Sequence, residues 1–472
     1  MNKIEQLLDW EAVEQHLVQV LDQKAPLHQE LHQLVAGEAL ILVRNWYGKL
    51  VLLLPCTQAE LERSQCHPLL IELQQAAGPL ALSPWVMCRD ELFSASDYWI
   101  DPALLPLLDA DQGNSGLQLK LLERQDKERD WLSPVANDAR ATKKAQRCVF
   151  YSVKGGVGRS SALTMLAIEL ARRGKRVLVV DGDFESPGLS SSVLPAGDGQ
   201  PTYGVVDWLT AQALGADPQT LNRMALESVV ESSPLNVKLG LRGEILVAPA
   251  YGQKTEAYVS KLARIYRQSP AGEAYAQRLN DFLQAVESEH QIDMTLFDCR
   301  AGIDDTAAAA VTQLRTDISF LFAIGTTQTW DSYRLLFKHL RRNPKLFPAQ
   351  TNHDDEERWN LRQSLRVVSA LTPQESGAYV GYFEKLQNSA YETFSAIYDA
   401  DDGDNSDALF APAPDDEDAP HFPMRVMWNE ALRAFNPLGQ PELLNDAMVR
   451  AGFDDFLQKA IALLGVQDEH NA

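Results

Sequence analysis

A glycine-rich loop between an apolar run and a helical pattern is the feature that most constrains the fold. Residues 148–153 form an apolar run that predicts a buried strand, and residues 160–173 carry apolar side chains at helical spacing. The loop at 154–161 lies between them. Glycines let a backbone wrap closely around phosphate oxygens, and the N–H groups at a helix N-terminus face the negative charge. This strand–loop–helix context predicts a phosphate-binding loop.

Further apolar runs predict that this loop belongs to an α/β domain. They lie at residues 176–180, 245–248, 294–297, 318–324 and 365–370, and helix-length segments separate most of them. Strands that are apolar on both faces are typical of parallel sheets covered by helices. We therefore expect a mostly parallel sheet with helices on both faces, within residues 147–465.

Residues 1–130 predict a separate, small α+β domain at the start of this chain of 472 residues. Its expected elements are a helix over 1–22, a hairpin over 38–56 and a further helix over 58–77. These residues contain no recognisable catalytic set, so the sequence assigns them no role. The polar and charged residues 131–146 are the expected linker.

A run of acidic residues interrupts the α/β domain near its end. Nine aspartate or glutamate side chains and no basic one lie between residues 399 and 418. Self-repulsion and low hydrophobicity favour a disordered loop near 399–420, and an acidic docking motif is the alternative.

Charge and cysteine content narrow the functional class. The formal net charge of −22 does not indicate nucleic-acid or membrane binding, although it leaves a local basic face open. Five scattered cysteines without a C-x-x-C pair fit a reducing cytoplasm and give no metal-site spacing. The N-terminus does not resemble a signal peptide, and no stretch reaches the ~18 apolar residues of a transmembrane segment. We expect a cytoplasmic protein.

The residues of the phosphate loop are Lys154, Gly155, Gly156, Val157, Gly158, Arg159, Ser160 and Ser161. The loop resembles the deviant Walker A motif of the ParA/MinD ATPases, K-G-G-x-G-K-[ST], in the variant subgroup spelled K-G-G-V-G-R. The likeness extends over residues 147–370 and implies a P-loop fold in which this loop binds ATP. It also implies that Lys154 reaches the nucleotide of a partner subunit, that the Ser160 hydroxyl binds Mg²⁺, and that Ser161 lies near the α-phosphate.

Arg159 departs from this motif, because it stands where the family has a phosphate-binding lysine. Arginine keeps the charge but is planar, bulkier and differently hydrated, so the exchange is not conservative. Its two donors could hold the β- and γ-phosphates, and they could also slow catalysis by misplacing the γ-phosphate. Nucleotide binding without useful hydrolysis and a nucleotide-free relic are therefore the alternatives.

Two acidic segments at strand ends resemble the family's switch segments. The run 176–180 leads into Asp181 and Asp183, and the likeness implies that Asp181 lies near Mg²⁺ while Asp183 orients the attacking water. The run 292–297 leads into Asp298, which would hold Mg²⁺ as in a Walker B strand. Phosphoryl transfer needs positioning and charge neutralisation more than a strong base. The expected metal ligands are Ser160, Asp181 and Asp298, and the expected catalytic residues are Asp183, Lys154 and Arg159.

The residues after Asp298 also depart from the family pattern. Where the family commonly has D-x-P-A-G, this chain has Arg300 in place of the proline, followed by Ala301 and Gly302. Gly302 could offer its backbone N–H to the γ-phosphate. We hypothesise that Arg300 adds positive charge near the γ-phosphate or across a dimer; an ion pair with Asp304 or Asp305 is the alternative. The family's base-contacting asparagine is missing after 365–370, so adenine specificity is implied by the resemblance alone.

The resemblance implies a molecular switch that binds ATP and Mg²⁺, forms an ATP-dependent homodimer, hydrolyses ATP slowly and controls a partner protein or assembly. The alternative is a non-hydrolysing nucleotide sensor or scaffold subunit in a multiprotein system, such as a defence or partition system. The helical pattern over 441–463 carries more acidic than basic residues, so we expect it to pack against the domain rather than to bind a membrane.

Overall fold

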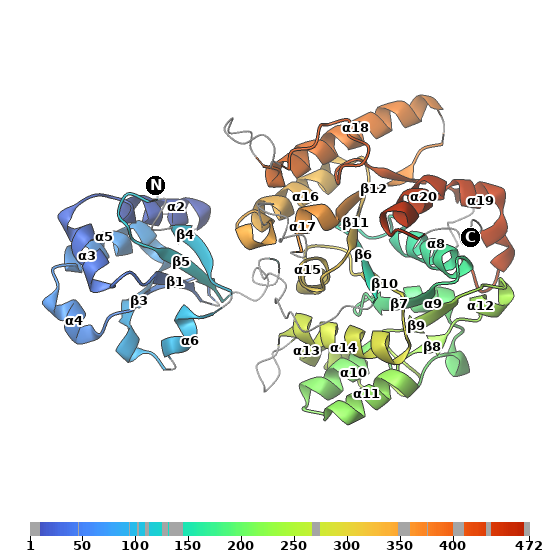
Figure 1. Cartoon of the computed structure of the whole chain (residues 1–472), viewed down its shortest axis with the longest axis horizontal. Coiled ribbons are helices and arrows are strands. Elements are labelled where there is room, and N and C mark those ends of the chain that lie inside the picture. Colours follow the sequence, from blue (N-terminus) through green and yellow to red (C-terminus); the bar gives the residue numbers. More distant parts are fainter. Residues whose placement is uncertain are drawn as a thin grey trace. The chain divides into compact units, whose positions relative to one another are not determined.

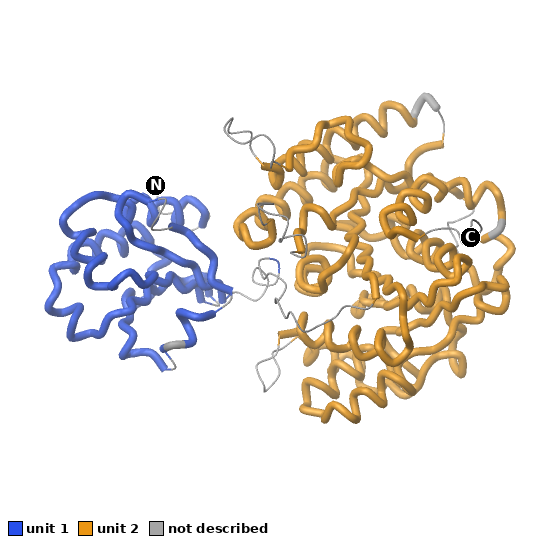
Figure 2. The backbone as a smooth tube through the Cα atoms, viewed as in Figure 1, with its two compact units in different colours: residues 1–133 blue, residues 134–472 orange. Residues whose placement is uncertain are grey.

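The computed structural model divides the chain into two compact units, residues 1–133 and 134–472 (Figure 2). It describes residues 10–45, 47–93, 95–101, 103–108, 113–124, 131, 145–266, 274–347, 359–374, 376–399, 410–430 and 436–466. Most of the expected linker at 131–146 lies outside the described residues.

The first unit is a five-stranded mixed sheet with helices (Figure 1). Its strand order is β3-β2-β1-β5-β4, and the first two strands form the expected antiparallel hairpin, with Leu42 opposite Leu52. Its main elements are α2 (Trp10–Leu21), α3 (Pro26–Leu34), β1 (Leu40–Arg44), β2 (Leu50–Leu54), α4 (Gln58–Arg63), α5 (His67–Ala77), β3 (Ala81–Cys88), α6 (Ala95–Trp99), β4 (Leu105–Leu108) and β5 (Leu119–Glu123).

The single helix expected over 58–77 is two helices, so that prediction is wrong between α4 and α5. Pro68 lies in the first turn of α5, where its missing N–H has no helical partner to lose. The same ring prevents an upstream helix from continuing through this position. The Ser64 hydroxyl donates to the Leu61 carbonyl at 2.8 Å and closes α4.

The second unit is built on an eight-stranded sheet in the order β13-β12-β11-β6-β10-β7-β9-β8. Its neighbouring strands are parallel, except that β8 runs antiparallel to β9. The six apolar runs expected as strands all lie in it, as β6 (Gln146–Ser152), β7 (Arg176–Gly182), β9 (Glu244–Ala248), β10 (Met294–Cys299), β11 (Ile318–Ala323) and β12 (Leu365–Thr372). The edge strands β8 (Glu231–Ser232) and β13 (Met424–Met427) were not among the expected runs.

Helices cover both faces of this sheet (Figure 1). Alternate strand side chains, such as Phe150 and Val179, pack in one core with α8 and α20, and Tyr151 on the opposite face contacts Tyr333 of α16. The main helices are α8 (Arg159–Arg172), α9 (Leu189–Val193), α10 (Val205–Ala213), α11 (Pro218–Glu227), α12 (Leu235–Lys238), α13 (Tyr258–Ile265), α14 (Tyr275–Glu289), α15 (Asp305–Ala308), α16 (Thr327–Leu340), α17 (Leu361–Ser364), α18 (Ser376–Phe394), α19 (Ala447–Ala451) and α20 (Asp454–Leu463). The predicted fold class, a mostly parallel α/β sheet preceded by a small α+β unit, is confirmed.

The C-terminal segment packs against the sheet. The pattern at 441–463 divides into a short 3₁₀ helix, α19 and α20. Phe456 of α20 is fully buried, and its ring lies edge-on to that of Phe320 with 5.1 Å between the centroids. This agrees with the expectation of domain packing. Across the described part of the chain, no helix is long and apolar enough to cross a membrane.

The acidic segment makes defined contacts at both of its described ends. Asp399 forms an ion pair with Arg362 at 2.7 Å and accepts a hydrogen bond from the Phe410 N–H at 2.8 Å. Residues 414–421 lie mostly in turns, and residues 400–409 lie outside the described residues. The disordered loop expected near 399–420 stays a prediction where it falls on residues 400–409.

Candidate nucleotide site

Three adjacent strands bring the candidate residues to one edge of the sheet. β10 lies between β6 and β7, and all three are parallel, so their carboxyl ends meet. The phosphate loop follows β6, while Asp181 and Asp298 are the second-to-last residues of β7 and β10. Asp181 and Asp298 are direct partners in the strand register. Ligands of open α/β sheets bind at this edge, beyond the carboxyl ends of the strands.

The phosphate loop uses two of its glycines for backbone conformation. Gly156 has φ 72° and Gly158 has φ 80°, a region that side-chain-bearing residues rarely adopt. A Cβ atom added at Gly155, Gly156 or Gly158 would meet no protein atom within 4 Å, so the space beside the loop is open. α8 begins directly after Gly158, and its N-terminus therefore lies at the loop. The backbone fits the phosphate-binding role expected of it.

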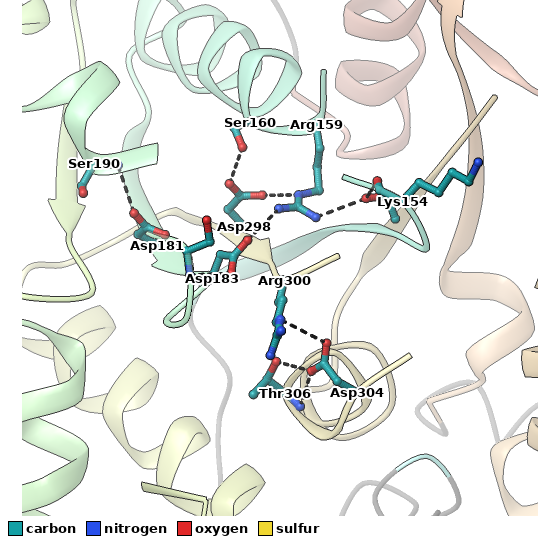
Figure 3. Close-up of polar contacts among 12 residues, drawn as sticks. Lys154, Arg159, Ser160, Asp181, Asp183, Ser190, Asp298, Arg300, Asp304 and Thr306 are labelled. Carbon is teal, nitrogen blue, oxygen red and sulfur yellow. Dashed lines mark hydrogen bonds and ion pairs between the residues drawn. The ribbon is translucent and has the colours of Figure 1, made fainter. Parts of the chain in front are cut away.

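The Arg159 guanidinium lies among acidic side chains (Figure 3). Its Nε donates to Asp298 Oδ1 at 2.5 Å, and its Nη2 lies 3.7 Å from Asp183 Oδ2. A third contact runs from Nη1 to the Ser152 hydroxyl at 3.2 Å. Arg159 is only 9% exposed. The guanidinium is thus bound to the carboxylates expected at the metal and the water, a placement that the sequence did not predict.

Ser160, Asp181 and Asp298 lie at the same edge of the sheet. The Ser160 hydroxyl donates to Asp298 Oδ2 at 2.6 Å. Asp181 Oδ2 accepts from the Ser190 N–H at 3.2 Å, and within the described residues its buried Oδ1 has no hydrogen-bond partner. Burial raises the pKa of Asp181 to about 7, and the charge of Asp298 adds to the rise. A buried carboxylate oxygen without a donor, beside a second carboxylate, needs a positive charge.

These three residues fit Mg²⁺ as an incomplete ligand set. Carboxylate and hydroxyl oxygens are the hard donors that Mg²⁺ prefers. The described residues contain no group of three or more histidine, cysteine or acidic side chains placed to hold a metal ion. Mg²⁺ commonly binds through one or two carboxylates together with substrate phosphates and waters, so the set here is of that kind.

Asp183 lies just outside the strand, in the loop after β7. Its Oδ1 accepts from the Ser186 N–H at 3.2 Å, and its Oδ2 faces Arg159. Partial burial raises the pKa of Asp183 above its ordinary value, and the Arg159 charge opposes the rise. The structure therefore brings the expected catalytic residues Asp183 and Arg159 together.

Lys154 does not join this cluster. Its side chain extends away from Asp298 and Arg159 (Figure 3), while its carbonyl accepts from the Ser152 hydroxyl at 2.7 Å. Val157 is buried, and Ser161 lies in the first turn of α8. The expected role of Lys154 at the nucleotide of a partner subunit stays a prediction.

Gly302 is held against the strand that carries the phosphate loop. Its N–H donates to the Ser152 carbonyl at 3.0 Å, and its carbonyl accepts from the Tyr151 hydroxyl at 3.0 Å. Its φ of 108° again favours glycine. The N–H that was expected to reach the γ-phosphate is engaged in this structure, so it would first have to leave Ser152.

Arg300 has a partner that the sequence did not indicate. Its Nη1 lies 2.6 Å from Glu185 Oε2, and its Nε lies 4.0 Å from Asp304 Oδ2. The alternative predicted from the sequence was an ion pair with Asp304 or Asp305. The contact with Asp304 is present, but it is longer than the contact with Glu185. Glu185 belongs to the acidic segment after β7, and the sequence analysis assigned it no role.

No curated protein sequence matches the chain significantly. Solved structures that resemble it include a ParA family ATPase from Chlorobium tepidum, at 16% identity and a TM-score of 0.40, covering 68% of this chain and 99% of that one. Another is the septum site-determining protein MinD, complexed with Mg-ADP, from Pyrococcus horikoshii. It has 21% sequence identity and a TM-score of 0.29, and the match covers 40% of this chain and 63% of that one. All these TM-scores lie below 0.5.

The family match is more specific than these structural likenesses. Residues 148–371 match the model of the CobQ/CobB/MinD/ParA nucleotide binding domain. This segment contains β6, the phosphate loop, both acidic strand ends and β12. The chain therefore carries, in residues 148–371, a nucleotide-binding domain of the CobQ/CobB/MinD/ParA family.

Proposed function

We propose that the chain is an ATP- and Mg²⁺-dependent switch that hydrolyses ATP slowly, dimerises around the nucleotide and controls a partner protein or assembly. The observation that carries the proposal is the contact of the first two residues of α8 with Asp298: Arg159 at 2.5 Å and Ser160 at 2.6 Å. This contact joins the turn that we propose binds phosphates to the acid that we propose binds the metal. The matching family model supports nucleotide as the ligand.

Each residue has a role in this proposal. The loop amides from Gly155 to Ser161 bind phosphates, and Arg159 moves from Asp298 onto the β- and γ-phosphates. Ser160, Asp181 and Asp298 would hold Mg²⁺, which would neutralise charge on the same phosphates. Asp183 orients the attacking water. Catalysis then depends on positioning and charge, as phosphoryl transfer generally does.

Lys154 is the residue proposed to act between subunits. Its side chain extends away from its own acidic cluster, so its charge is available to a nucleotide bound by a second copy (Figure 3). A dimer that needs this contact forms only when ATP is bound. Dimerisation then reports nucleotide state to a partner.

A second candidate function is a nucleotide sensor or scaffold that does not hydrolyse ATP. The Arg159 side chain favours it, because the buried guanidinium pairs with Asp298 at 2.5 Å and lies 3.7 Å from Asp183. If Mg-ATP does not dislodge the guanidinium, nucleotide binding would proceed without turnover. Calorimetric ATP binding without phosphate release, with partners present, would select this candidate.

The test is sedimentation velocity with ATP and Mg²⁺, combined with phosphate release from the same samples. The proposal expects a monomer that becomes a dimer with ATP. Lys154→Ala should bind nucleotide yet stay monomeric, and Asp183→Asn should dimerise while releasing phosphate at a much lower, still measurable rate. Competition between ATP and GTP for the wild-type site tests the expected adenine preference.

Asp217→Asn is the matched control for the aspartate variant. Asp217 is an exposed helix cap on α11, and asparagine caps a helix as well as aspartate does. This control should keep both activities. Monomers with Mg-ATP in the wild type and in Asp183→Asn would count against the switch.

A further inference from the structure

Two side chains from outside the phosphate loop contact the segment that carries Asp183. The Tyr258 hydroxyl, at the start of α13, donates to the Phe184 carbonyl at 2.7 Å. Arg300, which follows β10, pairs with Glu185 at 2.6 Å. The two contacts fall on the two residues directly after Asp183. Tyr258 lies outside the motifs of the sequence analysis, and Arg300 stands where the family commonly has a proline.

The position of the Asp183 carboxylate depends on this short piece of backbone. Its Oδ1 and its carbonyl both accept from the Ser186 N–H, at 3.2 and 3.1 Å. The Phe184 side chain is buried, which anchors the turn in the core. Since Phe184 and Glu185 lie within the turn that Asp183 and Ser186 close, fixing them fixes the carboxylate.

Contacts with neighbouring segments hold α13, the helix that begins with Tyr258, in place. Lys261 of the same helix pairs with Asp207 of α10 at 2.5 Å. The Tyr258 ring lies edge-on to that of Tyr251, with 5.6 Å between centroids. Burial raises the pKa of the Tyr258 phenol above its ordinary value, and the charge of Asp181 adds to the rise. The hydroxyl therefore keeps its proton and remains a donor.

Arg300 connects the two acidic segments of the site. It belongs to the segment after Asp298, while Glu185 belongs to the segment after Asp181. The Arg300 and Glu185 side chains are 36% and 43% exposed. An exposed ion pair adds little to the overall stability, and this one connects Glu185 to the segment after Asp298. Asp304, 4.0 Å from the Arg300 Nε, is a second acceptor within reach.

We propose that Tyr258 and Arg300 are positioning residues that act through Asp183, by holding residues 184 and 185 so that the carboxylate can orient the attacking water. The inference rests on the proposed hydrolytic function. A small displacement of a water-orienting group lowers turnover while nucleotide binding continues, because binding depends on the phosphate loop.

The first test separates turnover from binding. Tyr258→Phe removes one hydroxyl and should lower kcat about 5- to 10-fold, the effect of one lost hydrogen bond in the transition state. The dissociation constant for Mg-ADP should change less than about twofold. Tyr251→Phe is the matched control, since the Tyr251 hydroxyl has no hydrogen bond to any described residue. It should leave both constants unchanged.

The second test asks whether the effect passes through Asp183. In the Asp183→Asn background, Tyr258→Phe should lower kcat no further, because the group that it positions is already lost. Arg300→Gln and Glu185→Gln should each lower kcat, and the double variant should be no slower than the slower single variant. Additive losses in either cycle would overturn the positioning role.

A third readout needs no nucleotide. Amide hydrogen exchange of residues 183–189 should be faster in nucleotide-free Tyr258→Phe than in the wild type or in Tyr251→Phe. Unchanged exchange together with unchanged kcat overturns the inference and leaves the proposed ATPase intact. A wild-type chain that binds Mg-ATP but releases no phosphate overturns both the proposed hydrolysis and the role of Tyr258.

Discussion

The Arg159 Nε and the Asp298 Oδ1 are 2.5 Å apart at the carboxyl end of β10. This contact joins the residue that departs from the phosphate-loop motif to the acid expected to hold Mg²⁺. The Arg159 guanidinium places a positive charge beside Asp298 and, at 3.7 Å, beside Asp183. In the proposed switch, Arg159 leaves Asp298 when it binds the phosphates of Mg-ATP.

Arg159→Lys is expected to raise ATP turnover. Lysine is a compact point charge on a flexible chain and cannot hold Asp298, Asp183 and Ser152 together as the planar guanidinium does. The freed side chain should reach the β- and γ-phosphates more readily, with a gain in kcat of about 5- to 10-fold. Phosphate release at saturating Mg-ATP measures it.

A lysine variant with the same or lower kcat, at unchanged Mg-ATP affinity, would show that the arginine does not restrain catalysis. The proposed exchange of Arg159 between Asp298 and phosphate would then be wrong.

Asp298→Ala is expected to destabilise the second unit even without ligands. The variant leaves the Arg159 guanidinium, which is 9% exposed, without its closest carboxylate. Loss of one partner of a buried ion pair costs about 3–5 kcal/mol. Because Asp183 and Ser152 remain near the guanidinium, we expect the lower end, about 3 kcal/mol. Denaturant unfolding measures the change.

The double variant Arg159→Met with Asp298→Ala provides the control for this loss. It removes the stranded charge, so its unfolding free energy should lie above that of Asp298→Ala alone. Equal or lower stability of the double variant would mean that the buried charge is not the cause.

The sequence predicted the strands of the second unit and the edge at which the acidic residues meet, because the motifs and the apolar pattern indicate the same fold there. The six apolar runs became neighbouring strands, and the parallel order placed Asp181 opposite Asp298. The Arg159 contacts were not predictable, because the motif assigns that position to phosphate and the side chain can rotate toward either. Tyr258 lies 75 residues beyond Asp183, in a helix with no motif, so only the fold reveals its contact with Phe184.

Phe456→Ala is expected to destabilise the second unit through a cavity under α20. The ring is fully buried among Phe150, Phe320 and Phe322. Truncating a buried phenylalanine costs about 3–5 kcal/mol. Leu463→Ala is the control on the same helix, since its 41% exposed side chain should cost about 0.5 kcal/mol or less. Denaturant unfolding of both variants distinguishes packing from a surface role.

If Phe456→Ala were as stable as Leu463→Ala, α20 would not be part of the core. A membrane or partner surface on this helix would then have to be considered.

The buried His421 is expected to weaken the fold as the pH falls. Its Nδ1 lies 2.7 Å from the Tyr398 hydroxyl, and its Nε2 lies 3.3 Å from the Pro414 carbonyl. A carbonyl only accepts, so Nε2 carries the proton and Nδ1 accepts from the tyrosine in the neutral ring. Burial lowers the pKa of His421 below its ordinary value of 6.5, and the Pro414 carbonyl and Asp416 oppose the shift.

The sign follows from the direction of that shift. A histidine whose pKa is lower in the folded state binds its proton more readily when unfolded. Its contribution to stability is therefore present above pH 6.5 and is lost as the pH falls below it. Unfolding free energies between pH 7.5 and 5 should decline more steeply for the wild type than for His421→Gln. Parallel declines would contradict the neutral histidine.

The most direct measurement is a crystal structure of the chain grown with Mg²⁺ and a non-hydrolysable ATP analogue. The account predicts a triphosphate against the backbone amides of residues 155–161, the metal ion at Ser160 and Asp298, and Arg159 turned away from Asp298 toward the phosphates. An empty loop, with the Arg159 guanidinium still bound to Asp298 at saturating nucleotide, would contradict it.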